Sequence, residues 1–145
     1  MYDMKKILIV EDDPKDELLI RRSLKNAGLI NPIVVANDGE RAFDVLFPKD
    51  GSEGMQPALI LLDLKLPRIS GVDVLKKIRT EERTRKIPVV ILTSSDEPYD
   101  IDSCYTCGAN SYVRKPVNFD DFSKAVERVG LYWILTNESP ETECF

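Results

Sequence analysis

The sequence contains no histidine among its 145 residues. Histidine is the commonest general base and the commonest metal ligand in proteins. Its absence excludes a Ser-His-Asp or Cys-His mechanism within this chain. A metal ion bound here should therefore be a hard cation that takes oxygen ligands.

Long hydrophobic segments and an excess of basic charge are also missing. No apolar run approaches the roughly 20 residues that a membrane-spanning helix needs, and the start of the chain has no signal-peptide-like hydrophobic stretch. The net charge is −5, whereas a nucleic-acid-binding surface normally needs a basic face. We expect a cytoplasmic protein that binds neither membranes nor nucleic acids directly.

Cysteine is scarce, with three residues in the chain. Cys104 and Cys107 form a C-x-x-C pair, and Cys144 is next to last. The pair is either a redox dithiol or two small residues one turn apart on a helix. We favour the second interpretation, because no Pro or Trp precedes the pair and no βαβ start adjoins it. A zinc site would need more ligands than Cys144 can add.

Short apolar runs alternate with amphipathic stretches along the chain. The pattern predicts five strands, over residues 6–11, 33–36, 58–63, 87–93 and 111–113. It predicts helices over 14–27, 39–47, 72–82, 98–107 and from 119 onward. This alternation indicates an α/β fold with a doubly wound, five-stranded parallel sheet and right-handed crossovers. The length suits a single domain, which we place at residues 1–136 with an extended last helix and a flexible tail at 137–145.

Capping residues mark several of the predicted helix starts. The expected N-caps are Asp13, Asp38 and Asn118, and Asp13 is followed by Pro14 at the first position of its helix. The first helix is expected to turn four apolar residues toward the core: Leu18, Leu19, Leu24 and Ala27.

Polar residues that can perform chemistry stand at the ends of four predicted strands. They are the pair Glu11-Asp12, then Asp63, Thr93 and Lys115. In a doubly wound sheet these strand ends meet at one edge, where crowded carboxylates need a cation or shifted pKa values. Carboxylates bind Mg²⁺, one carboxylate can attack a phosphoryl group, and a hydroxyl and an ammonium can hold phosphoryl oxygens.

Each of these residues also has a purely structural interpretation. Asp63, Glu11 and Asp12 would then be helix or loop caps, Thr93 an ordinary strand residue and Lys115 a solvated charge. Their joint occurrence at strand ends favours function.

The combination resembles the receiver domain of two-component response regulators, over residues 5 to about 130. The resemblance implies a flavodoxin-like (βα)5 fold in which Asp63 is a Mg²⁺-dependent phosphoacceptor. Glu11 and Asp12 match the acidic pair that binds Mg²⁺, together with Asp63 and the backbone carbonyl of Lys65. Gly71 matches the loop that follows the phosphoacceptor.

Other matches concern the response to phosphorylation. By resemblance, Thr93 is a switch hydroxyl, Lys115 contacts the phosphoryl group, and Tyr112 is the aromatic residue coupled to Thr93. Pro116 matches a proline that usually follows a cis peptide bond. The resemblance implies a signal read from the fourth helix, fifth strand and fifth helix, in a regulator that is not itself an enzyme.

The phosphodonor must be a partner, because this chain has no histidine. The resemblance implies a sensor histidine kinase or a phosphotransfer protein. A narrower likeness to small single-domain regulators paired with phytochrome-type kinases rests on the opening Glu-Asp-Asp-Pro-Lys-Asp, the long loop at 48–57 and the aromatic end Leu131-Tyr132-Trp133.

The last helix carries apolar residues close to helical spacing: Phe122, Val126, Val129, Trp133 and Leu135. We hypothesise a homodimer through this helix, because exposed aromatic residues are enriched at interfaces. The alternative is that Trp133 folds back on its own domain.

Three other classes are weaker. An aspartyl-phosphate hydrolase needs an acid two residues after the nucleophile, where this chain has Lys65. A flavodoxin-like cofactor binder needs a Ser/Thr/Gly-rich phosphate loop in place of Glu-Asp-Asp. A receiver-like binding module that works without phosphorylation remains the alternative.

Overall fold

In the computed structural model, which describes residues 5–140, five parallel strands form one sheet in the order β2-β1-β3-β4-β5. The chain places β2 on one side of β1 and then places β3, β4 and β5 on the other side. The carboxyl ends of β1 and β3 therefore flank the topological switch point, where ligands bind in open α/β sheets. The strands are β1 Ile7–Val10, β2 Ile33–Ala36, β3 Leu59–Leu62, β4 Val89–Thr93 and β5 Ser111–Arg114.

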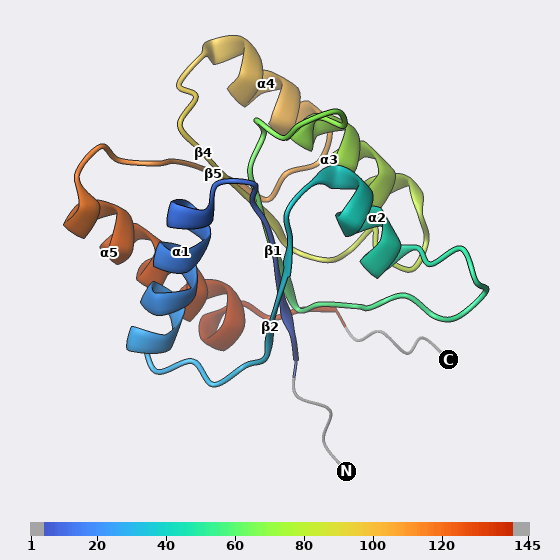
Figure 1. Ribbon diagram of the computed structural model, residues 1–145, viewed down its shortest axis with the longest axis horizontal. Helices are drawn as coiled ribbons and strands as arrows, with labels where there is room; N and C mark the ends of the chain where they lie inside the picture. Colours follow the sequence, from blue (N-terminus) through green and yellow to red (C-terminus); the bar gives the residue numbers. More distant parts are fainter. Residues whose placement is uncertain (1–4, 141–145) are drawn as a thin grey trace.

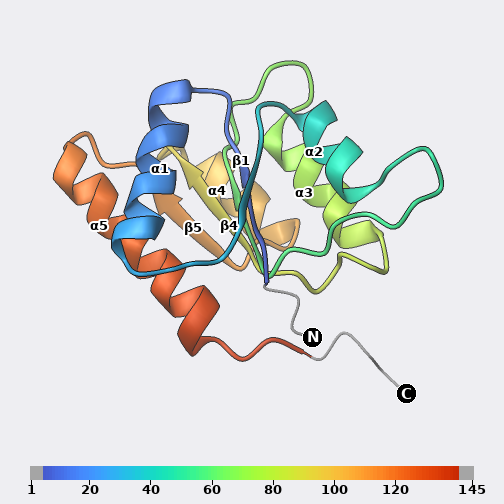
Figure 2. The same ribbon diagram turned by 60° about the horizontal axis from the view of Figure 1, so that its bottom comes forward.

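Helices cover both faces of this sheet, as Figures 1 and 2 show. One face carries α1 and α5, and the other carries α2, α3 and α4. The helices are α1 Pro14–Asn26, α2 Gly39–Leu46, α3 Gly71–Thr80, α4 Pro98–Thr106 and α5 Phe119–Gly130. The predicted α/β fold class, a doubly wound five-stranded parallel sheet, is confirmed.

Two apolar layers explain why the central strands read as continuous hydrophobic runs. On β1, Leu8 and Val10 pack in the layer shared with α2, α3 and α4, whereas Ile7 and Ile9 pack in the layer shared with α1 and α5. A parallel strand buried on both faces needs an apolar residue at every position. The first polar residue after such a run therefore marks the edge of the sheet.

The predicted N-caps are confirmed, and one predicted core residue is wrong. The side chain of Asp13 accepts a hydrogen bond from the backbone N–H of Lys15 at 2.8 Å. The side chains of Asp38 and Asn118 also accept backbone N–H groups in the first turns of α2 and α5. Leu18 is 40% exposed, however, and Ile20 is buried in its place. Since α1 packs against α5 as well as the sheet, its buried stripe is rotated from the predicted one.

The last helix differs from an ordinary extended α-helix. After α5 the chain continues as a π-helical segment, η1 Leu131–Thr136. Trp133 and Ile134 are partly buried against the α1 and α5 layer, so Trp133 does fold back on its own domain. Leu131, Tyr132 and Leu135 remain exposed.

Three further expectations can be compared with the structure. Within residues 5–140 every peptide bond is trans, so the cis bond expected before Pro116 is not found; cis and trans differ by only about 1 kcal/mol before proline, and local packing decides between them. Cys104 is buried and Cys107 half-buried, and both are free thiols, whereas Cys144 lies outside the described residues. No helix in the described part of the chain is long and apolar enough to cross a membrane.

Candidate functional site

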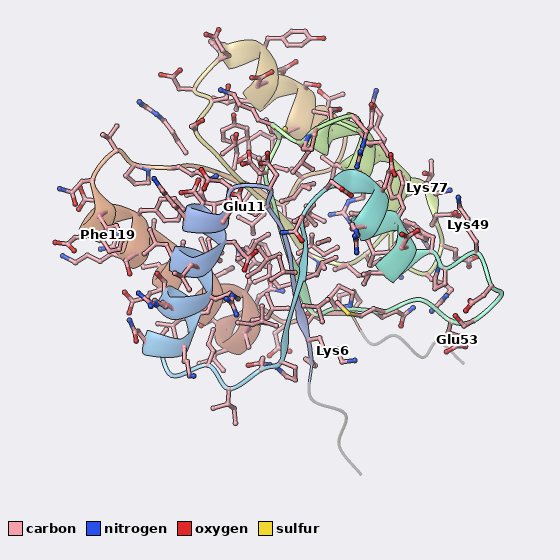
Figure 3. All side chains as sticks on the ribbon, viewed as in Figure 1. Lys6, Glu11, Lys49, Glu53, Lys77 and Phe119 are labelled. Carbon is pink, nitrogen blue, oxygen red and sulfur yellow. The ribbon has the colours of Figure 1, made fainter. Side chains whose placement is uncertain are left out.

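Strand pairing brings two acidic side chains to the same level of the sheet edge. Val10 of β1 pairs with Leu62 of β3, and the next residues are Glu11 and Asp63. The backbone N–H of Asp63 donates to the carbonyl of Val10 at 3.0 Å. Both acids are buried, with exposed fractions of 1% for Glu11 and 6% for Asp63. Figure 3 shows Glu11 at the end of β1, where the chain turns into α1.

A third carboxylate, that of Asp12, lies beside this pair on the side of the solvent. One oxygen from each of Glu11, Asp12 and Asp63 lies within 4.8 Å of the others, and Asp12 is exposed. The backbone N–H of Lys65 donates to Asp63 Oδ1 at 3.2 Å, which holds the Lys65 backbone beside the same carboxylate. A cluster made only of oxygen donors fits a hard divalent cation such as Mg²⁺.

One ammonium group already lies among the carboxylates. Lys115 Nζ is 2.6 Å from Glu11 Oε1, 2.8 Å from Asp16 Oδ2 and 3.0 Å from Asp63 Oδ2. Burial lowers the pKa of Lys115, but the hydrogen bonds that its ammonium donates to Asp16 and Glu11 and the charge of Asp63 outweigh burial and raise the pKa above the usual value. The ammonium therefore stays protonated and compensates part of the cluster's negative charge.

The surroundings favour the charged form of Lys115, but they favour the neutral form of Glu11. Burial is the main cause that raises the pKa of Glu11 to about 7, and the charge of Asp63 adds to it, while Lys115 opposes the rise. A carboxyl group that gains a proton this easily is short of positive charge. A divalent cation beside it would supply that charge, which agrees with the oxygen-donor cluster.

Asp16 is a site residue that sequence reasoning missed. It lies in the first turn of α1, where an acidic residue favours the helix dipole and needs no further explanation. Its ion pair with Lys115 joins residues 99 positions apart. Only the packing of α1 against α5, together with the position of Lys115 in the loop that leads into α5, could identify it.

The hydroxyl of Thr93 has no hydrogen-bond partner within residues 5–140, although the residue is fully buried. Thr93 ends β4, and its carbonyl accepts the backbone N–H of Lys115 at 2.6 Å. A buried hydroxyl without a partner costs free energy, so its presence calls for an explanation. An acceptor that arrives at this edge of the sheet would provide one.

Tyr112 ties β5 to the loop that follows β4. Its hydroxyl donates to the backbone carbonyl of Ser95 at 2.7 Å. Ser95 is itself hydrogen-bonded to Asp100 in α4. The loop after Thr93 is thus fastened to both the fifth strand and the fourth helix.

Gly71 allows α3 to start against the site. A Cβ atom at this position would lie 2.2 Å from the carbonyl oxygen of Asp63 and 2.7 Å from Leu64 Cα. The backbone N–H of Gly71 donates to the carbonyl of Leu64 at 3.0 Å. Only glycine permits this approach, which holds the start of α3 against the backbone of Asp63 and Leu64.

Most of the residues predicted from the sequence are thus brought together. Glu11, Asp12, Asp63 and Lys115 form one cluster, and Thr93 ends the strand next to Asp63. The side chain of Lys65 is exposed, and only its backbone faces the cluster.

The family model of the response regulator receiver domain matches residues 7–127. The chain therefore belongs to the response regulator receiver family, which confirms the resemblance. It is 40% identical over 134 residues to the probable methanogenesis regulatory protein FilR2 of Methanothrix harundinacea, which covers 92% of this chain and 86% of that protein. It is 34% identical over 137 residues to the response regulator Rcp1 of Synechocystis, which covers 94% and 93%.

Solved structures agree with these relatives. The Mn²⁺-bound form of Rcp1 superposes with a TM-score of 0.87 at 33% identity, over 94% of this chain and 99% of that chain. The phosphorylated cyanobacterial phytochrome response regulator RcpA superposes with a TM-score of 0.86 at 33% identity, over 96% and 100%. Receiver-domain regulators are signalling proteins that histidine kinases phosphorylate on an aspartate, and they bind Mg²⁺ in an acidic pocket.

Proposed function

We propose that this protein is a single-domain response regulator that accepts a phosphoryl group onto Asp63 from a partner histidine kinase, in a Mg²⁺-dependent reaction of a phosphorelay. One observation carries the proposal: the buried carboxylate of Asp63 shares an oxygen cluster with Glu11 and Asp12 and lies 3.0 Å from Lys115 Nζ. This arrangement places a nucleophile, a possible cation site and an ammonium group next to one another.

The residues divide the work of phosphoryl transfer. An oxygen of Asp63 forms a bond to phosphorus while the phosphorus–nitrogen bond of the partner's phosphohistidine breaks, and the imidazole leaves as the neutral ring after it takes a proton. Lys115 holds a phosphoryl oxygen through a charge-assisted hydrogen bond. Glu11, Asp12, Asp63 and the backbone carbonyl of Lys65 would hold Mg²⁺, which neutralises charge on the phosphoryl oxygens.

The signal starts at the unpartnered hydroxyl of Thr93. A phosphoryl group on Asp63 adds about −1.5 to −2 charges and three strong acceptors. Thr93 then turns to donate a hydrogen bond to the phosphoryl group. This movement changes the conformation of the loop after β4, which Tyr112 holds through its hydrogen bond to the carbonyl of Ser95. The surface of α4, β5 and α5 is the proposed output, because this loop joins β4 to α4.

A direct test is the intact mass of the protein after incubation with acetyl phosphate and Mg²⁺. We expect a gain of one phosphoryl group that disappears in Asp63→Asn and when Mg²⁺ is removed. Asp44→Asn is the matched control, because Asp44 is exposed on α2, away from the cluster, and should take the phosphoryl group normally. No gain under any condition would favour the phosphorylation-independent binding module.

A phytochrome-type histidine kinase is the first class of donor to test. The phosphorylated RcpA structure is that of a phytochrome response regulator, and two further structural neighbours are bacteriophytochrome response regulators. Transfer from such a kinase to this chain, but not to its Asp63→Asn variant, is the expected result. Failure of transfer from a kinase that phosphorylates its own regulator in the same assay would reject this partner class.

We further propose that the receiver unit extends to Thr136 at the end of η1, and that a homodimer forms through η1. Leu131, Tyr132 and Leu135 are 37%, 50% and 68% exposed there. Sedimentation velocity should show a dimer at tens of micromolar that Leu135→Ser weakens. Ile30→Ser is the control, since Ile30 is an equally apolar residue that is 81% exposed elsewhere on the surface. A strict monomer, with and without phosphorylation, would refute the dimer.

A further inference from the structure

Asp16 differs from the other two acceptors of the Lys115 ammonium. Its side chain is 30% exposed, whereas those of Glu11 and Asp63 are 2% and 8% exposed. It also lies outside the group of carboxylates whose oxygens are close enough to hold one cation, which consists of Glu11, Asp12 and Asp63.

The three N–H donors of an ammonium match these three acceptors in number. In phosphoryl transfer, Glu11 and Asp63 must turn their oxygens toward the cation and the phosphorus. The hydrogen bonds that Lys115 donates to these two carboxylates are then weakened or lost. The hydrogen bond that Lys115 donates to Asp16, at 2.8 Å, is the one whose acceptor takes no part in the reaction.

The position of Asp16 is fixed independently of the site. It lies on α1, which Asp13 caps and which Ile20 and Leu24 bury against the core. A carboxylate on such a helix holds its partner with little further loss of side-chain freedom. This rigidity is what a group needs in order to hold an ammonium at a fixed distance from a reacting carboxylate.

We propose that Asp16 is a positioning residue, which keeps the Lys115 ammonium beside Asp63 when Glu11 and Asp63 are engaged with the cation and the phosphoryl group. The inference rests on the proposed phosphoacceptor function. It assigns to α1 a part in phosphoryl transfer that does not include metal binding.

The test compares Asp16→Asn with a matched control, Asp13→Asn. Both variants remove one negative charge from the start of α1, and asparagine replaces aspartate well as an N-cap. Within residues 5–140, Asp13 forms no hydrogen bond or ion pair with the Lys115 side chain. The difference between the variants therefore isolates the ion pair from the change in charge. Asp16→Glu retains the carboxylate and serves as the conservative replacement.

The first readout uses Mg²⁺ alone and no phosphodonor. It is the ¹H–¹⁵N correlation of the Lys115 ammonium, which survives only while hydrogen bonds slow exchange with water. With saturating Mg²⁺ we expect the signal to persist in the wild type and in Asp13→Asn, to vanish in Asp16→Asn and to return in Asp16→Glu.

The second readout is the rate of phosphoryl uptake from acetyl phosphate at saturating Mg²⁺. We expect Asp16→Asn to be about tenfold slower, as for the loss of one charge-assisted hydrogen bond, and Asp13→Asn to change by less than about twofold. Equal behaviour of Asp16→Asn and Asp13→Asn in both readouts would overturn the proposal, as would a failure of Asp16→Glu to recover either one. If the wild type itself takes no phosphoryl group, the proposed function fails, while the ammonium signal still decides the role of Asp16.

Discussion

Replacing Gly71 by alanine should damage both the stability of the protein and its phosphoryl uptake. The added methyl carbon would lie 2.2 Å from the carbonyl oxygen of Asp63 and 2.7 Å from Leu64 Cα, whereas ordinary contacts are 3.4–4 Å. Both atoms belong to the backbone, so no side-chain rotation relieves the overlap. The start of α3 must instead move away from Asp63 by about 1 Å.

The expected cost combines two opposing effects. Overpacking of this kind destabilises by roughly 3 kcal/mol, the upper part of the usual range, because neither neighbour is flexible. Alanine is favoured over glycine in helices by about 1 kcal/mol, which offsets part of this cost at the first residue of α3. We therefore expect the free energy of unfolding to fall by about 2 kcal/mol. Displacement of Asp63 by about 1 Å should slow phosphoryl uptake by about 100-fold.

Denaturation by guanidinium chloride, followed by circular dichroism, measures the first effect, and the mass assay with acetyl phosphate measures the second. Gly51→Ala is the control, because Gly51 has a φ of +83° and no atom within 4 Å of an added Cβ. It should lose about 1 kcal/mol through backbone strain alone and keep normal uptake. If Gly71→Ala unfolds within about 0.5 kcal/mol of the wild type and takes phosphate normally, the steric argument is refuted.

Three further predictions concern Thr93 and Cys104, which are buried, and Arg79, which is half-buried. Thr93→Val should stabilise the unphosphorylated protein by about 1 kcal/mol, because it removes a buried hydroxyl without a partner, and it should abolish the structural response to phosphorylation; lower stability in chemical denaturation would contradict this. Arg79 donates to two backbone carbonyls and to Asn110 Oδ1 at 2.7–2.8 Å, so Arg79→Met should lower the free energy of unfolding by about 2–3 kcal/mol in the same measurement. Arg79→Lys should recover only part of this stability, because lysine lacks the planar fork. Full stability in Arg79→Met would show that the three hydrogen bonds make no net contribution. Burial raises the pKa of Cys104 to about 11, so its thiol should react with iodoacetamide at pH 8 about 100-fold more slowly in the folded protein than in urea, as mapped by mass spectrometry. Because the folded state binds this proton more tightly, the thiol's contribution to stability should be constant below about pH 8 and decline as the pH rises from about 9 toward 11; fast alkylation of the folded protein would show that the thiol is not protected.

The order of elements and the main residues of the candidate site were predictable from the sequence for a local reason. A parallel strand covered on both faces reads as an unbroken apolar run, and it ends where the chain reaches the edge of the sheet. The acids Glu11 and Asp63 stand at those ends and were therefore recognisable from their neighbours in the chain. The caps Asp13 and Asp38 were recognisable in the same way, because capping depends on residues two or three positions away.

Other features depend on how helices dock, which neighbouring residues do not determine. Leu18 and Ile20 both fit an amphipathic pattern, and the packing of α1 against α5 selects Ile20 for the core. The segment after α5 has helical spacing in the sequence, yet it forms the π-helical η1, in which Trp133 reaches the core.

The sequence alone determined the α/β class, the approximate strand positions and the carboxylates that gather at one edge, because each of these follows from short-range patterns. Only the tertiary structure decided which of the 25 acidic and 20 basic residues meet. The ion pair between Asp16 and Lys115 spans 99 positions, and nothing near either residue distinguishes it from any other pairing. Charges attract at a distance in space rather than in sequence, so the folded backbone has to bring them together before a chemical role can be assigned.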